Sequence, residues 1–249
     1  MTQHAALTAR HSELSPTTVE RLDAYVTAVL ACPAALARVG GVHVIAAVRR
    51  ALPAWHGYVL PIAGVSYPTG AVLAVRPDLA DRLTAAMGSD AHLPTLDHIA
   101  WRRVYRAVLR LASFAFSLMG DMRAVDDERF QPSATEHRAE HIPRDDPAAM
   151  HLRNRFDGEV FGVRGPHGRL VSWAALKLKS PDVWEVAVAT EPDFRGRGYA
   201  RDVVSAATRY TLDQGRLSLY VHDDENRTSA FVSRALGFQR YAEVILVEY

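Results

Sequence analysis

The stretch from Glu185 to Asp202 restricts the fold of this chain more than any other part of its 249 residues. A run of apolar residues with strand character leads into a turn with glycine at positions 196 and 198, and an amphipathic helical pattern follows. Because glycine lacks a Cβ atom, this turn can bend sharply and let backbone N–H groups converge on a ligand. The start of the helix adds unpaired N–H groups and the positive end of its dipole. The pattern predicts a strand–turn–helix unit that can hold a pyrophosphate, and an ordinary strand–helix turn is the alternative.

Two other phosphate-binding motifs do not fit this turn. A P-loop ends in Gly-Lys-Ser/Thr, and the turn contains no lysine. A dinucleotide-binding fingerprint needs a third glycine at the position that Arg201 occupies. The spacing therefore excludes both motifs.

A second pattern lies further along the chain. The run Leu217–His222 predicts a strand, and the stretch from Asn226 to Gly237 predicts a helix. Asparagine can cap the start of such a helix, and glycine can end it.

Together the two patterns resemble the GNAT superfamily of N-acetyltransferases. The pyrophosphate loop of that family follows Arg/Gln-x-x-Gly-x-Gly/Ala, which is matched here by Arg195, Gly198 and Ala200. The later helix of the family begins Asn-x-x-Ser/Ala and is followed by a Gly-Phe pair, matched here by Asn226, Ser229, Gly237 and Phe238. The resemblance covers residues 133–249.

The resemblance implies an α/β (α+β) fold with a mixed sheet flanked by helices, and acetyl-CoA (coenzyme A) as the cofactor. It implies that the pyrophosphate lies on the amides of residues 195–200 and that the pantetheine pairs with the backbone of residues 188–190. One N–H of that strand would polarise the thioester carbonyl. The implied cofactor-binding residues are Val188, Ala189, Thr190, Arg195, Gly196, Arg197, Gly198, Tyr199, Ala200, Asn226 and Ser229.

The implied reaction is acetyl transfer from acetyl-CoA to a primary amine by direct attack in a ternary complex. The chain is thereby predicted to be an acyltransferase, a GNAT-type N-acetyltransferase, whose partner is a small-molecule or peptide amine acceptor. The sequence leaves open whether the chain forms a homodimer. The alternative from another class is a catalytically weak acyl-CoA-binding or regulatory protein that keeps the fold.

The expected general acid is missing from its usual position. Many GNAT relatives place a tyrosine seven residues after the asparagine, and this chain has Ser233 there. A serine hydroxyl is a much poorer proton donor than a phenol with a pKa of about 10. Ser233 is therefore a candidate only by position, and three other phenols stay open as donors: Tyr199, Tyr220 and Tyr241.

The sequence also leaves open which residue is the general base. Some relatives use a glutamate eleven residues before the first residue of the loop, where this chain has Trp184. Glu185 is the candidate base, but one residue further along a regular strand points to the opposite face. A β-bulge would correct its direction. The alternative is a strand carboxylate paired with a neighbouring arginine.

Residues 1–120 carry a pattern of their own. It predicts helices from Ser15 and at 77–87 and 96–119, with strands at 42–48, 58–65 and 71–75. Residues 120–133 are polar and aperiodic, which is typical of a boundary. We therefore expect an N-terminal α+β domain of unknown role, residues 1–120, and a GNAT-like domain, residues 133–249.

Within the GNAT-like domain, the pattern predicts strands near 135–142 and at 160–164, 170–178, 183–190, 217–222 and 241–248, and helices at 144–156, 199–214 and 226–236. Only one helix, 144–156, fits between the first two of these strands, whereas the resemblance implies two. This shortage leads to the hypothesis that residues 1–120 help to build or cover the acceptor pocket.

Composition narrows the remaining choices. The 29 basic and 28 acidic side chains leave a net charge of +1, which argues against a nucleic-acid partner. Only Lys177 and Lys179 are lysines, which we attribute to base composition. The single cysteine, Cys32, excludes an intrachain disulfide and a multi-cysteine metal site, and no metal is predicted. No apolar run is long enough to span a membrane, so we expect no membrane partner and a cytoplasmic protein.

Overall fold

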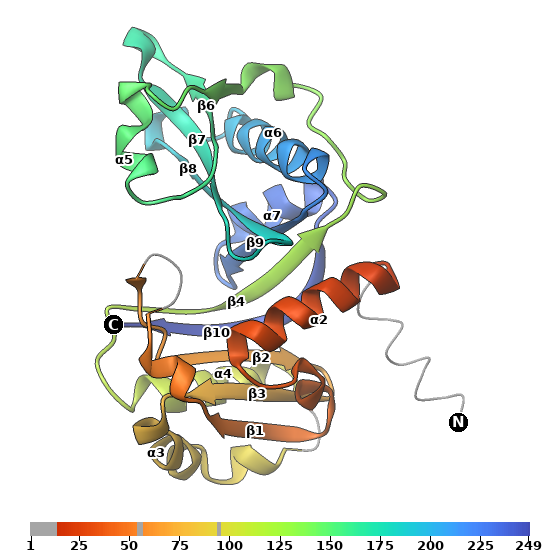
Figure 1. Cartoon of the computed structure of the whole chain (residues 1–249), viewed down its shortest axis with the longest axis vertical. Helices are drawn as coiled ribbons and strands as arrows, with labels where there is room; N and C mark the ends of the chain where they lie inside the picture. The colour runs from red at the N-terminus through yellow and green to blue at the C-terminus, as the bar shows by residue number, and fades with distance from the viewer. Residues whose placement is uncertain (1–13, 54–56, 94–95) are drawn as a thin grey trace. The chain divides into compact units, whose positions relative to one another are not determined.

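The computed structural model describes residues 14–53, 57–93 and 96–249 (Figure 1). The chain divides into two compact units. Unit 1 holds residues 123–222 and 226–241 together with the residues up to Thr18, and unit 2 holds residues 19–122, 223–225 and 242–249. Three strands, β4 (Phe116–Val125), β9 (Leu217–Asp223) and β10 (Gln239–Glu248), contribute residues to both units.

Unit 2 contains a mixed sheet covered by helices. In this sheet β1 pairs in parallel with β3, and β2 pairs antiparallel with both β3 and β10. The buried side chains of Leu73, Trp101 and Ile245 belong to its hydrophobic core. The elements are α2 (Pro16–Leu30), β1 (Gly41–Ala46), β2 (Ile62–Tyr67), β3 (Gly70–Val75), α3 (Pro77–Met87) and α4 (His98–Leu109).

Unit 1 also contains a mixed sheet, in the order β5-β6-β7-β8-β9, with α6 packed against β6, β7 and β8. Neighbouring strands are antiparallel except for the parallel pair β8 and β9. The elements are β5 (Glu140–Ile142), α5 (Met150–Arg153), β6 (Val160–Arg164), β7 (Leu170–Lys177), β8 (Val183–Thr190), α6 (Tyr199–Asp213), β9 (Leu217–Asp223) and α7 (Arg227–Ala235). The predicted fold class, a mixed sheet flanked by helices, is confirmed.

The prediction of one helix over residues 96–119 is wrong. Helix α4 ends at Leu109, and β4 begins at Phe116. A continuous apolar run such as Leu111–Met119 fits a buried strand as well as a helix, so its periodicity does not decide between them. Pairing with β10 decides for the strand, and β4 therefore extends into the segment 120–133 that was predicted to be irregular.

The elements between β4 and β6 are shorter than predicted. Residues 136–138 form a 3₁₀ turn, η5, so only Glu140–Ile142 of the predicted strand 135–142 is a strand. The predicted helix 144–156 is reduced to a 3₁₀ turn at Pro147–Ala149 and to α5. The Asp146 side chain accepts a hydrogen bond from the Ala148 backbone N at 2.8 Å and so starts the helical turn at Pro147.

Among the described residues, no helix is both long and apolar enough to cross a membrane.

Candidate functional site

Strands β8 and β9 separate soon after they begin. Their parallel pairing covers only residues 183–185 and 217–219, whereas β7 stays paired with β8 up to Thr190. In the described part of the chain, residues 186–190 of β8 therefore have a strand partner on one edge only. An exposed strand edge is a template that an extended ligand can pair with.

The turn after β8 has the backbone conformation that the two glycines predict. Gly196 and Gly198 have φ angles of 76° and 80°, in the left-handed region that favours glycine. Gly198 caps α6, and the hydrogen bond from the backbone N of Asp202 to the carbonyl O of Gly198, at 3.2 Å, is the first i to i−4 bond of this helix. The N–H groups of residues 199–201 precede that bond and are available to an anion.

Arginine side chains surround this turn. Arg195 and Arg197 are exposed and donate to the backbone carbonyls of Thr190, at 3.2 Å, and Asp193, at 3.1 Å. Arg201 donates from Nε to the Ser133 Oγ at 3.2 Å. The turn thus combines N–H groups at the start of a helix with positive side chains, an arrangement suited to a multiply charged anion.

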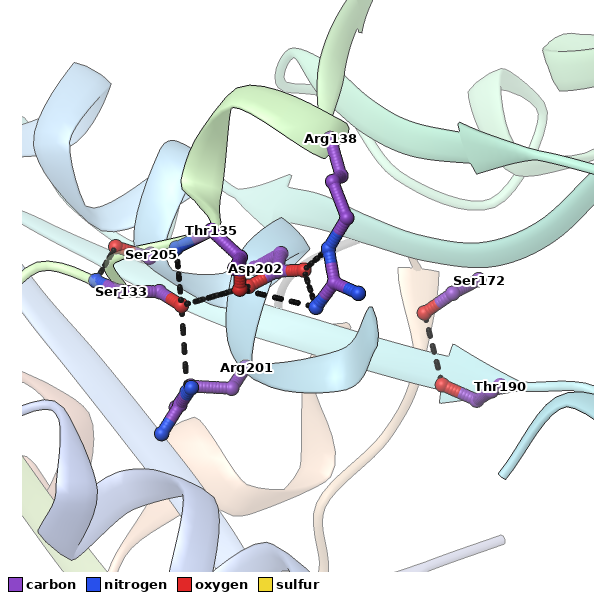
Figure 2. A network of polar contacts seen from close by, with 8 residues as sticks. All are labelled: Ser133, Thr135, Arg138, Ser172, Thr190, Arg201, Asp202 and Ser205. Carbon is purple, nitrogen blue, oxygen red and sulfur yellow. Dashed lines mark hydrogen bonds and ion pairs between the residues drawn. The ribbon is translucent and has the colours of Figure 1, made fainter. Parts of the chain in front are cut away.

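A buried carboxylate lies directly behind the turn (Figure 2). Asp202, with a fully buried side chain, accepts hydrogen bonds from Ser133 Oγ at 2.6 Å and Thr135 Oγ1 at 2.7 Å. Arg138 of η5 forms an ion pair with it at 2.5 Å. The sequence patterns do not predict this network. Its only signal is an acidic residue beside Val203, within the apolar face of the helix.

Asn226 caps α7 as predicted. Its Oδ1 accepts a hydrogen bond from the backbone N of Ser229 at 3.0 Å, while the residue itself is exposed. Ser233, one turn after Ser229, is fully buried and donates from Oγ to the Ala230 carbonyl at 3.1 Å. The Ser233 hydroxyl is thus engaged within its own helix.

Glu185 lies in a buried ion pair. The side chain pairs with Lys177 and, at 3.5 Å, with Lys179, the only two lysines of the chain. Burial raises the pKa of Glu185, but the charges and hydrogen bonds of both lysines outweigh it and hold the pKa below its usual value. The partners are lysines, where the alternative interpretation expected an arginine. The register with β7 has no bulge at Glu185, so the residue stays on the face opposite Trp184.

The three remaining phenols lie in different surroundings. Tyr199 is half-buried beneath the guanidinium of Arg138, at 5.0 Å from its ring centroid, and Tyr241 is buried in β10. Tyr220, on β9 just past the end of the pairing with β8, is 2% exposed. Burial raises the pKa of Tyr220, and the Ser229 hydroxyl beside it opposes this rise. The Tyr220 hydroxyl makes no well-formed hydrogen bond to the described residues.

No cluster of three or more metal-ligating side chains occurs in the ranges that the structure describes. His141, four residues after His137 in the sequence, contacts Glu159 at 2.9 Å.

Comparisons with known proteins find a family model that matches part of this chain. Residues 122–238 match the model of the acetyltransferase (GNAT) family. No curated protein matches the chain.

Solved structures match it at low identity. A Novosphingobium aromaticivorans protein described as a GNAT-family acetyltransferase shares 20% identity over 55% of this chain and 66% of its own, with a TM-score of 0.48. A GCN5-related N-acetyltransferase from Kribbella flavida shares 17% identity over 58% of this chain and 62% of its own, with a TM-score of 0.44. A Salmonella typhimurium protein described as an acetyltransferase, solved with its cofactor acetyl-CoA, shares 16% identity over 41% of this chain and 69% of its own, with a TM-score of 0.33. The chain thus spans less than two thirds of the first two structures.

Proposed function

We propose that the chain, whose residues 122–238 match the model of the acetyltransferase (GNAT) family, transfers an acetyl group from acetyl-CoA to a primary amine in a ternary complex. One observation carries the proposal. The strand edge of β8 left open at residues 186–190 leads directly into the left-handed turn and the start of α6, where Arg195 and Arg197 are exposed. A long ligand with an amide-containing arm and a pyrophosphate fits both features in sequence.

The residues of this region fit acetyl-CoA. The backbone of Val188, Ala189 and Thr190 is the edge that would pair with the pantetheine. The turn and helix start that would hold the pyrophosphate comprise Arg195, Gly196, Arg197, Gly198, Tyr199 and Ala200. Asn226 uses Oδ1 to cap α7, which leaves its Nδ2 group as a donor toward the arm, next to Ser229.

When bound, acetyl-CoA supplies an acetyl group activated as a thioester. A backbone N–H in the stretch 188–190 would donate a hydrogen bond where negative charge develops as the amine attacks. The strand edge and the turn together would hold acetyl-CoA in one orientation for attack by the amine. No covalent bond to the protein is needed.

Tyr220 is a better candidate than Ser233 for the general acid, the group that protonates the thiolate of coenzyme A as it leaves. Ser233 Oγ already donates to the Ala230 carbonyl, whereas the Tyr220 hydroxyl makes no well-formed hydrogen bond to the described residues and is therefore free to donate. We expect Tyr220→Phe to lower kcat about a hundredfold and Ser233→Ala to leave it unchanged. The reverse result would return the role to Ser233.

Glu185 remains the candidate base, with a property that can be tested. Its two lysine partners hold its pKa low, so it accepts a proton weakly. If Glu185 acts as the base, Glu185→Gln removes the acidic limb from the pH profile of kcat. If the pair is only structural, the variant lowers the free energy of unfolding and leaves the shape of the profile intact.

The central experiment uses the whole chain. Acetyl-CoA is titrated by calorimetry, and thiol release is followed with a panel of small amines, polyamines and lysine peptides. Saturable binding with amine-dependent thiol release supports the transferase. Saturable binding without turnover on any amine supports the alternative, a regulatory acyl-CoA-binding protein, which the serine at position 233 favours. Absence of binding overturns both.

The proposal also covers the division of the chain into domains and its location in the cell. A division into domains 1–120 and 133–249, and the hypothesis that the first domain is needed for use of the amine, are tested by expressing residues 133–249 alone. A fragment with unchanged kcat/KM for the amine would refute the role of residues 1–120. We place the reaction in the cytoplasm, because a lone cysteine suits a reducing compartment.

A further inference from the structure

Arg138 lies against the proposed pyrophosphate turn, although it belongs to a segment outside both family motifs. A Cβ atom built on Gly198 would be 3.1 Å from the Nη2 of Arg138. The guanidinium carbon is 5.0 Å from the ring centroid of Tyr199, the first residue of α6. The positive group of Arg138 is therefore located at the helix N-terminus itself.

The orientation of this guanidinium is fixed from behind. Nε and Nη2 contact Asp202 Oδ2 at 2.7 and 2.5 Å, and Nη2 also donates to Thr135 Oγ1 at 2.9 Å. Figure 2 shows that Asp202 is held in turn by the hydroxyls of Ser133 and Thr135. A carboxylate with no exposed surface and hydrogen-bonded on both oxygens cannot follow a moving arginine, so it pins that edge of the guanidinium.

The other edge of Arg138 is open. Its Nη1 has no hydrogen bond or ion pair with the residues that the structure describes, and the side chain is 33% exposed. An arginine whose Nε and Nη2 are occupied by a buried acid still offers Nη1 as a directed, charged donor. Phosphate oxygens are preferred acceptors for such a donor.

We propose that Arg138 is a cofactor-binding residue that donates a hydrogen bond to the pyrophosphate of coenzyme A, and that Asp202 is the positioning residue that orients it. This inference rests on the proposed function, since it assumes that coenzyme A binds at the turn. We assign this contact to the pyrophosphate because Arg138 lies beside Gly198, in the turn proposed to hold that group.

The test compares two arginine–carboxylate pairs that connect η5 with α6. Arg138 pairs with Asp202 at the start of the helix, and Arg209 pairs with Glu136 at 2.6 Å further along it. Arg138→Gln is therefore matched by Arg209→Gln. The double variant Arg138→Gln/Asp202→Asn removes the guanidinium without leaving a buried charge unpaired, and serves if the single variant does not fold.

The measurements are dissociation constants for CoA and for 3′-dephospho-CoA, together with KM and kcat. Arg138→Gln and the double variant should weaken binding of both ligands at least tenfold and raise KM for acetyl-CoA with little change in kcat. Arg209→Gln should bind both as the unchanged chain does. Equal losses in Arg138→Gln and Arg209→Gln would show a structural effect only. Unchanged binding in Arg138→Gln, or a loss for CoA alone, would overturn the pyrophosphate contact. If the unchanged chain binds neither ligand, the proposed function fails instead.

Discussion

Alanine substitutions at the two glycines of the turn should differ in their effect on stability, although the backbone conformations are almost the same. Gly196 and Gly198 have φ angles of 76° and 80°. Placing a residue with a Cβ atom in this left-handed region costs about 1–2 kcal/mol. A Cβ on Gly196 meets no heavy atom within 4 Å, whereas one on Gly198 lies 3.1 Å from Nη2 of Arg138. Only the second substitution therefore forces a neighbour to move.

The size of the difference follows from how firmly Arg138 is held. Moving its guanidinium by a few tenths of an ångström stretches its contacts with Asp202, at 2.5 and 2.7 Å. A hydrogen bond to a charged group contributes about 1.5–3 kcal/mol, so partial disruption should cost about 1 kcal/mol. We expect Gly196→Ala to lower the free energy of unfolding by about 1–2 kcal/mol and Gly198→Ala by about 2–3 kcal/mol.

Urea unfolding of the ligand-free chain, followed by tryptophan fluorescence, measures both values without any contribution from cofactor binding. The decisive control is a double-mutant cycle with Arg138→Ala. In that background nothing remains for the new methyl group to contact, so the effect of Gly198→Ala should fall to that of Gly196→Ala. Equal effects of the two substitutions in the original chain, or an excess at Gly198 that survives removal of Arg138, would refute the reasoning.

Two further predictions concern the same unit. Gly237→Ala should prevent unit 1 from folding normally, because Gly237 has a φ of 87° and the added Cβ would lie 2.0 Å from the carbonyl oxygen of Arg129. The control is Gly215→Ala: Gly215 has a φ of 70° and open space around it, so this substitution should lower the free energy of unfolding by only about 1–2 kcal/mol. Circular dichroism and urea unfolding distinguish the two variants, and equal effects would refute the clash. Lys177→Met should lower the free energy of unfolding by about 1.5–3 kcal/mol at pH 7, since it removes a charged partner of the buried Glu185. Because the folded pKa of Glu185 is depressed, the stabilisation by this pair is complete above the unfolded pKa of about 4.3 and is lost as the pH falls through the folded pKa. The two proteins should therefore converge in stability in acid, and a difference that persists there would contradict the assignment.

The parts of the fold that could be predicted are those with a strong local signal. β8 and α3 have the predicted bounds, Val183–Thr190 and Pro77–Met87. The first is a short apolar run bounded by turn residues, and the second begins with proline and ends before a glycine with positive φ. The glycines of the turn and the cap at Asn226 were predictable because they satisfy requirements of the backbone within a few residues.

The parts that could not be predicted depend on residues distant in the sequence. β4 is a strand because of its partner β10, which begins more than a hundred residues later. Both lysines of the chain contact Glu185, although their scarcity was attributed to base composition. Lys177 lies directly opposite Glu185 in the register of β7 and β8, so this partner was available once the two strands were aligned.

The segment between β4 and β6 shows why a site can depend on residues that sequence patterns overlook. Residues 133–138 form little regular structure, yet Ser133, Thr135 and Arg138 supply three of the groups that hold Asp202. A buried carboxylate is stable only when donors surround it, and these donors can come from any part of the chain that reaches it. The motif at 195–200 specifies the backbone that would hold a phosphate, but not what fixes the start of α6 behind it. That support comes from an irregular segment about sixty residues earlier, and the same arginine that neutralises Asp202 is the one at Gly198. Helix anchoring and ligand binding are therefore expected to change together when this segment is altered.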